Sequence, residues 1–372
     1  MTPRDRFQKI MRFQKPDRAP LWDLEGITEG AVRQWCIDGF PPGRTVHEFI
    51  GFDAYERVAL STGPIPSFVP RTIDEDDETV TTIDQYGFKI KTLKERAVPP
   101  TTYYYIEGSV KTRQDWQEMK RRYDPRDIRR RPAHWGEELF EYLRTVDRPV
   151  SLTIVWGPGR GPKNGYMLGQ EEFLEALTGQ QALIHDIFDF WADFVIELVR
   201  ELLENAPIDF VWLSEDGIAY RNSTVISPAM YRELWHPYVR RVTDFLRSHG
   251  VDIIGHYTSG NITPLIPSFL DAGINLFGPL ECAADMDAVG LRKEYGKDVL
   301  LMGNISRASL MAGPDAVEEE FNRKVPWLMD QGGYIPAIDD MILPDISFAS
   351  MMKYVELIRG FEIGNARKQF SG

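Results

Sequence analysis

The sequence has few of the features that mark extracellular or membrane proteins. Its 372 residues include two cysteines, Cys36 and Cys282, which are too few for a disulfide framework, so a reducing compartment is expected. No apolar run approaches the roughly 18 residues that a membrane span needs. The first residues lack the apolar core of a signal peptide. These absences predict a cytoplasmic protein with no membrane partner.

Net positive charge is also missing. The formal net charge is -13, which argues against a nucleic-acid partner because basic side chains provide most contacts to the phosphate backbone. Compact metal-ligand motifs such as His-Glu-x-x-His or paired Cys-x-x-Cys are absent too. What is present is a chain with 43% hydrophobic residues, enough to bury a large core around a small-molecule site.

Short apolar runs alternate with helical stretches along most of the chain. The runs predict eight strands, at residues 19–24, 55–60, 150–155, 208–213, 252–255, 275–278, 299–302 and 334–338. This count and alternation predict a single α/β domain over residues 1–372, a (β/α)₈ TIM barrel preceded by an N-terminal helix. Between residues 79 and 110 the apolar period falls to two, which predicts an antiparallel hairpin insertion.

Acidic and imidazole side chains follow several of these strands. In a TIM barrel the active site lies at the C-terminal ends of the strands. We therefore predict five catalytic residues, Glu215, Asp216, His256, Glu281 and Asp340. The alternative is structural, because adjacent acids are often solvated and a lone histidine or a buried Cys282 is often a packing residue.

Further residues near the strand ends are candidates for contact with substrate. We predict Trp22, Glu25, Trp156, Tyr257 and Asp339 as pocket residues. The sequence leaves open whether Asp339 or Asp340 points into the barrel, since a shift of one residue reverses the face.

A metal is a further expectation at the same strand ends. Nitrogen and oxygen ligands from His256, Glu215 and Asp340 would suit a zinc ion with one open position.

Taken in order, these residues resemble the uroporphyrinogen decarboxylase superfamily, which includes the decarboxylase and cobamide-dependent methyltransferases. The resemblance covers nearly the whole chain. Its most specific segments are Ile226-Ser227-Pro228, Trp235-His236-Pro237-Tyr238, Ala272-Gly273-Ile274-Asn275, Leu301-Met302-Gly303-Asn304-Ile305 and Gly332-Gly333-Tyr334-Ile335-Pro336. The resemblance implies a TIM barrel and an enzyme.

The chain departs from both activities of that family at matching positions. Where decarboxylases carry Arg-Gln-Ala-Gly-Arg, this chain has the acidic segment 23–27, and the catalytic aspartate position holds Leu60. The zinc methyltransferases use a His-x-Cys pair and a second cysteine. Here His256 is kept, but Thr258 and Asp340 replace the two cysteines.

The loss of arginines and the gain of acids argue against a polycarboxylate substrate. The leading hypothesis is therefore a methyltransferase acting between a small substrate, such as a methyl ether or a methylamine-like compound, and a corrinoid carried on a partner protein. In that hypothesis zinc, as a Lewis acid, assists at an oxygen-rich site. The alternatives are a cofactor-free decarboxylase or lyase acting on a smaller acid, and a non-enzymatic binding barrel. A homodimer is a further expectation.

Overall fold

The computed structural model describes residues 1–41, 43–94, 103–159 and 161–361. Its strands form two sheets, one parallel and one antiparallel. The strands are β1 Glu56–Val58, β2 Arg71–Glu75, β3 Thr79–Ile83, β4 Lys89–Leu93, β5 Tyr103–Glu107, β6 Val150–Val155, β7 Phe210–Ser214, β8 Ile254–Tyr257, β9 Leu276–Gly278, β10 Leu300–Ile305 and β11 Tyr334–Ile338. The fold is mixed α/β, as predicted.

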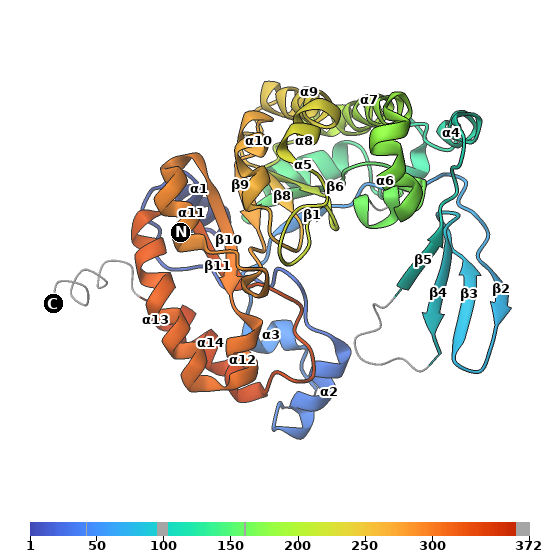
Figure 1. Ribbon diagram of the computed structural model, residues 1–372. Coiled ribbons are helices and arrows are strands. Elements are labelled where there is room, and N and C mark those ends of the chain that lie inside the picture. The colour runs from blue at the N-terminus through green and yellow to red at the C-terminus, as the bar shows by residue number, and fades with distance from the viewer. Residues whose placement is uncertain (42, 95–102, 160, 362–372) are drawn as a thin grey trace.

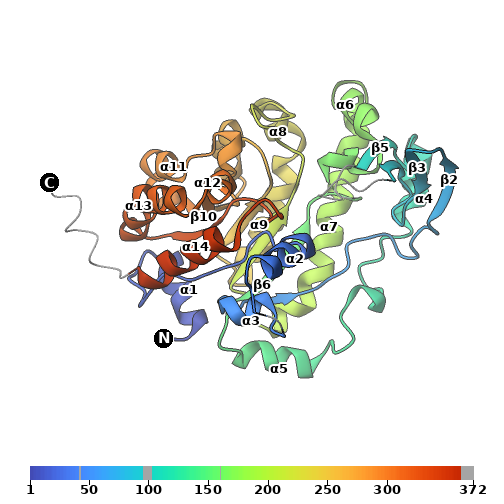
Figure 2. The same ribbon diagram turned by 90° about the horizontal axis from the view of Figure 1, so that it is seen from below.

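The α-helices of the described residues surround the parallel sheet in Figures 1 and 2. They are α1 Pro3–Met11, α2 Glu29–Ile37, α3 Val46–Ile50, α4 Arg113–Lys120, α5 Glu137–Thr145, α6 Gln170–Gly179, α7 Gln181–Asn205, α8 Pro228–Leu234, α9 His236–Ser248, α10 Ile266–Asp271, α11 Ala288–Tyr295, α12 Arg307–Ala312, α13 Pro314–Gln331 and α14 Phe348–Gly360. None of these described helices is both long and apolar enough to cross a bilayer.

The parallel sheet has the order β1-β6-β7-β8-β9-β10-β11, so each strand pairs with the next strand of this sheet along the chain. Its two faces bury different clusters. On β7, Phe210 and Trp212 belong to a cluster that also holds residues of α1, whereas Val211 and Leu213 belong to the larger cluster under the helices. We call these the inner face and the helix-covered face. The alternation follows from the two-residue period of a strand.

The predicted first strand at 19–24 is not a strand among the described residues. Pro20 has no N–H to donate to a ladder, and the N–H of Leu21 instead donates to the carboxylate of Asp53 at 2.8 Å. Three residues after the segment, Ile27 forms an isolated parallel bridge with Ile342, which lies beyond the end of β11. The described structure thus has seven parallel strands, and a closed barrel of eight is not shown. The single-domain extent stays a prediction.

Helix α1 packs at the N-terminal ends of the strands. Thr2 caps it in a capping box with Asp5, and Pro3 occupies the first turn, where its missing N–H costs nothing. Gln8 donates to Asp209, just before β7, at 2.6 Å. The carbonyl of Ile10 accepts from the N–H of Gly333, just before β11, at 2.9 Å. The opposite, C-terminal ends of the strands therefore form the end of the sheet where a site can open.

The predicted insertion is a four-stranded antiparallel sheet with the order β2-β3-β4-β5. It extends the predicted hairpins by one strand, β2, and it stands to one side of the helices in Figure 1. Buried Phe88 and Ile90 attach it to the main core. Part of the predicted range, residues 95–102, lies outside the described residues.

Candidate functional site

Two residues on the inner face meet at the C-terminal end of the sheet. Tyr257 is the last residue of β8 and follows the inner-face alternation, because its ring packs edge-on against Trp212 at 5.5 Å. Its hydroxyl donates a hydrogen bond to Oε1 of Glu25. Glu25 lies in the irregular segment that leads to the bridge at Ile27. The chain thus brings together two of the predicted pocket residues that are 232 positions apart.

Burial and neighbouring charges change the acidity of Glu25. Its pKa is raised from 4.5 to about 7. Desolvation is the largest cause, because burial disfavours the charged form, while the hydrogen bond from Tyr257 lowers the pKa. The carboxylates of Asp340, Asp216 and Asp23 raise it further, in that order. Glu25 is therefore about half protonated near neutral pH.

Glu25 and Tyr257, together with the three aspartates whose charges act on Glu25, form a group at the C-terminal end of the parallel sheet. We call this group the mouth cluster; its members are Glu25, Tyr257, Asp216, Asp340 and Asp23. Asp216 follows β7 and Asp340 follows β11, so the strand ends position both. Asp23 accepts from the N–H of Gly26 at 2.8 Å, which shapes the turn before the bridge. It also lies 3.0 Å from Nε2 of His47 on α3.

The second site prediction, the pair Glu215 and His256, assembles on the other side of the sheet. His256 lies opposite Leu213 in the ladder and shares its helix-covered face. Its Nε2 is 3.0 Å from Oε2 of Glu215, and the two residues are only 1% and 2% exposed. The other oxygen of Glu215 accepts from Tyr166 at 2.5 Å and from Nε1 of Trp235 at 2.8 Å.

The imidazole of His256 is held by packing as well. Its ring stacks on Phe269 of α10 at 4.2 Å, and its Nδ1 is buried without a hydrogen-bond partner among the described residues. The Glu215–His256 pair is therefore enclosed by other side chains of the protein. The network ties the ends of β7 and β8 to the helices behind them, and it leaves the neighbours Asp216 and Tyr257 at the mouth.

Only two of the three expected zinc ligands come together. His256 and Glu215 bond to each other on the helix-covered face, whereas Asp340 is exposed and acts on Glu25. Among the described residues, no group of three or more His, Cys, Asp or Glu side chains is arranged to hold a metal ion. These residues do not fit the expected metal site.

The two neighbouring aspartates after β11 have different surroundings. Asp339 is 4% exposed and accepts from the backbone N–H of Cys282 at 2.7 Å and of Arg307 at 2.8 Å. Desolvation raises its pKa. Asp339 therefore joins three chain segments, whereas Asp340 is exposed and its charge raises the pKa of Glu25.

The remaining predicted site residues each contact other parts of the protein, and their predicted roles stay predictions. Glu281 accepts from the N–H of Gly260 at 2.9 Å, which fixes the turn after β8. Trp22 is buried on the inner face and stacks on Phe7 of α1 at 5.6 Å. Trp156 stacks on Phe188 of α7 at 6.2 Å, on the helix-covered side. No contact between these three residues and the acids near Glu25 is among these interactions of the described residues.

Cys282 belongs to a polar cluster beside the last strands. Its sulfur lies 3.4 Å from Nζ of Lys324, which also pairs with Glu320 at 2.6 Å. Burial raises the pKa of the Cys282 thiol, and the charge of Asp339 adds to this effect. A raised pKa disfavours the thiolate that a nucleophile needs.

Sequence reasoning missed Tyr166, Trp235 and His47. Tyr166 lies in the 3₁₀ helix Pro162–Met167 with φ at 48°. Trp235 lies between α8 and α9, where an aromatic residue is usually interpreted as part of the core. The signal that could have found Trp235 is its place in one of the family-like segments.

A family model described as uroporphyrinogen decarboxylase (URO-D) matches residues 164–361, more than half of the chain. The chain belongs to the uroporphyrinogen decarboxylase family. This confirms the resemblance seen in the sequence. The matched residues include β7 to β11 and the strand-end acids Asp216 and Asp340, whereas Glu25 lies outside the match.

Other comparisons add little. A search of curated proteins found no match. Among solved structures, a variant of the GH36 α-galactosidase AgaA from Geobacillus stearothermophilus, in complex with 1-deoxygalactonojirimycin, shares 14% identity. The match covers 63% of this chain and 33% of that enzyme, with a TM-score of 0.33. This chain spans about a third of that enzyme's length, and so low a likeness carries no argument.

Proposed function

We propose that this member of the uroporphyrinogen decarboxylase family is a methyltransferase. It moves a methyl group from a small, neutral methyl ether to a corrinoid carried on a partner protein. The observation that carries the proposal is the mouth cluster, in which the half-protonated Glu25 is hydrogen-bonded to Tyr257 and surrounded by aspartates. Such a cluster offers a proton donor and a field that disfavours anionic ligands.

The charge of the cluster argues against the family's decarboxylase activity. Two like charges about 4 Å apart repel by about 1 kcal/mol in water and by several times more near a protein surface. Asp340, Asp216 and Asp23 already raise the pKa of Glu25, so a substrate carboxylate in the same place would meet the same repulsion. A neutral ether avoids it.

Glu25 fits the role of general acid for the leaving oxygen. When the carbon–oxygen bond of the ether breaks, its electron pair stays on the oxygen, which must then take up a proton. A carboxylic acid with a pKa near the working pH serves this step best, and Glu25 has a pKa of about 7. Tyr257 holds the acid in place through its hydrogen bond.

A corrinoid supplies the nucleophile that accepts the methyl group. This chain need not ligate the cobalt. It must leave the ether open to the partner protein at the strand ends, and it must protonate the product. The exposed Asp340 shows that the mouth cluster reaches the surface of the protein. Glu25 is the proton donor in this proposal. The Glu215–His256 pair does not touch the substrate in this proposal and positions the ends of β7 and β8.

The test is methyl transfer from a panel of aryl methyl ethers to free reduced cobalamin, followed by visible absorbance. We expect transfer by the wild-type chain and a loss of at least about 100-fold in Glu25→Gln, which keeps the shape but removes the proton, in line with the usual size of acid catalysis. Exposed Glu29→Gln is the matched control. Carbon dioxide release from a carboxylic acid panel, with no methyl transfer, would contradict the proposal and favour a carboxy-lyase.

A further inference from the structure

Glu25 lies in a turn that a single side chain closes. Oδ1 of Asp23 accepts from the N–H of Gly26 at 2.8 Å, so the carboxylate links the two ends of the segment 23–26. Aspartate side chains often close turns in this way, by accepting from a backbone N–H a few residues later. Gly26 has a φ of 93°, a left-handed conformation that suits glycine. The direction of Glu25 therefore depends on where the carboxylate of Asp23 is held.

The second oxygen of the same carboxylate has a partner outside the turn. Oδ2 of Asp23 lies 3.0 Å from Nε2 of His47, on α3. On the sheet side, Leu24 packs against the inner-face cluster, and Glu25 accepts from the hydroxyl of Tyr257. The turn is thus held from two directions, by β8 through Tyr257 and by α3 through His47.

The backbone of His47 belongs to a short helix with both ends tied down. Thr45 caps the start of α3 in a capping box with Glu48. At the other end, Arg359 of α14 donates a hydrogen bond to the carbonyl of Ile50. These contacts also place the carboxylate of Glu48 and the guanidinium of Arg359 on the same helix. The helix therefore holds the backbone of His47 beside the turn.

The ring of His47 contacts both the protein and the solvent. It packs against Phe52 at a centroid distance of 5.3 Å, and 63% of the side chain is exposed. Nε2–H can donate to Asp23 in the imidazolium and in one of the two neutral forms of the ring. The hydrogen bond therefore does not require His47 to be charged, and an uncharged donor of similar reach can replace it.

We propose that His47 is a positioning residue for Glu25: it holds the carboxylate of Asp23, which closes the turn that presents Glu25 to Tyr257. Burial is the largest cause of the raised pKa of Glu25, and a looser turn would let water reach its carboxyl group. Loss of the His47 contact should therefore move the pKa of Glu25 toward its ordinary 4.5. The effect on methyl transfer rests on the proposed function, whereas the effect on this titration does not.

The charge of His47 would act in the opposite direction. A cation beside Asp23 offsets part of the negative charge that raises the pKa of Glu25, so removing that cation alone would raise the pKa further. Two substitutions separate position from charge. His47→Phe keeps a ring beside Phe52 but has no donor. His47→Gln is uncharged but keeps an amide N–H that can donate to Asp23.

The experiment is carbon NMR of the glutamate carboxyl groups in the full chain, with the Glu25 signal followed across its titration. In His47→Phe the midpoint should fall by at least about 0.5 pH unit, toward 4.5. In His47→Gln it should stay close to that of the wild type. Shifts of the same sign and size in both variants, or an unchanged midpoint in His47→Phe, would overturn the proposal. Equal rises would mean that only the charge of His47 acts on Glu25.

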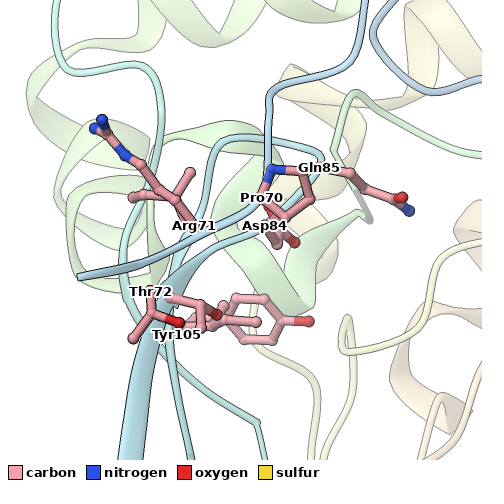
Figure 3. A pocket seen from close by; sticks show the side chains of 9 residues that line it. Pro70, Arg71, Thr72, Asp84, Gln85 and Tyr105 are labelled. Carbon is pink, nitrogen blue, oxygen red and sulfur yellow. The ribbon is translucent and has the colours of Figure 1, made fainter. Parts of the chain in front are cut away.

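Arg71→Gln is the control for the loss of a positive charge. Figure 3 shows the side chain of Arg71 extending away from Thr72 and Tyr105, beside a cavity of about 430 Å³. Among the described residues that line this cavity, none belongs to the mouth cluster, so the midpoint of Glu25 should not change. Circular dichroism checks that each variant folds, which a change at an exposed side chain should preserve.

The rate of methyl transfer gives a second readout. In His47→Phe, kcat should fall at least about 10-fold while KM for the ether changes little, because a misplaced proton donor slows the chemical step and not binding. His47→Gln should recover most of the wild-type rate. A rise in KM alone would overturn the positioning role. A wild-type chain with no methyl transfer would instead contradict the proposed function, and the titration midpoints of Glu25 would still decide the role of His47.

Discussion

Replacing Glu25 by glutamine gives a stability test of the mouth cluster that does not depend on any assumed reaction. The glutamine keeps the size and hydrogen-bonding capacity of the side chain but cannot ionise. In the wild type the pKa of Glu25 is about 7 in the folded protein against an ordinary value of 4.5. The folded chain therefore retains a proton that the unfolded chain releases between these two values.

The sign of the effect follows from this difference. Because the folded state binds more protons, the free energy of unfolding falls as the pH rises through the window from 4.5 to about 7. Below this pH window Glu25 is protonated in both states and does not lower the free energy of unfolding. Above it the cost is complete and amounts to about 3 kcal/mol, at about 1.4 kcal/mol per pH unit. This is an upper bound, since Glu25 is partly exposed and solvent screens its charge.

The assay is urea denaturation followed by tryptophan fluorescence across that pH window. The Glu25→Gln variant should match the wild type at the acid end and exceed it by up to about 3 kcal/mol above neutral pH. Glu29→Gln, at an exposed helix position, should follow the wild-type curve throughout. Parallel curves for wild type and Glu25→Gln over the whole window would refute the reasoning, because Glu25 would then titrate alike in both states.

Further predictions concern the surroundings of that residue and two buried networks. Tyr257→Phe removes a hydrogen bond that lowers the pKa of Glu25, so the pH-dependent loss of stability should extend above about 7. Asp340→Asn removes a repelling charge and should move the end of that loss toward 4.5. Glu215→Ala leaves a buried imidazole, phenol and indole without their acceptor and should cost about 3–5 kcal/mol in urea denaturation. A cost below about 1 kcal/mol would contradict the network. Asn304→Ala removes the hydrogen bonds that the side-chain amide donates to backbone carbonyl groups, including that of Leu280. The change lies at a residue with φ of 64°, and calorimetry should show that the free energy of unfolding falls by about 3 kcal/mol.

The parallel strands could be predicted where apolar, β-branched runs are unbroken. β6 and β11 have the bounds that were predicted for them. The prediction of a strand at 19–24 was wrong because Pro20 has no N–H to donate and the N–H of Leu21 donates to the side chain of Asp53 instead of to a neighbouring strand. The local sequence does not indicate a hydrogen-bond partner some 30 residues away.

The site was harder to predict because successive side chains of a strand point to opposite faces of the sheet. His256 and Tyr257 were both expected in the site, yet the first faces the helices and the second the mouth. The pairing of Tyr257 with Glu25 depends on the tertiary fold, which joins residues 232 positions apart. Chemical type was readable from the sequence, and direction was not.

The most direct test of the central claim is carbon NMR of the glutamate carboxyl groups, with the Glu25 signal assigned by its loss in Glu25→Gln. The account predicts a titration midpoint near 7, moving upward in Tyr257→Phe. A midpoint near the ordinary 4.5 would contradict it, because the mouth would then hold a carboxylate at neutral pH and no proton donor.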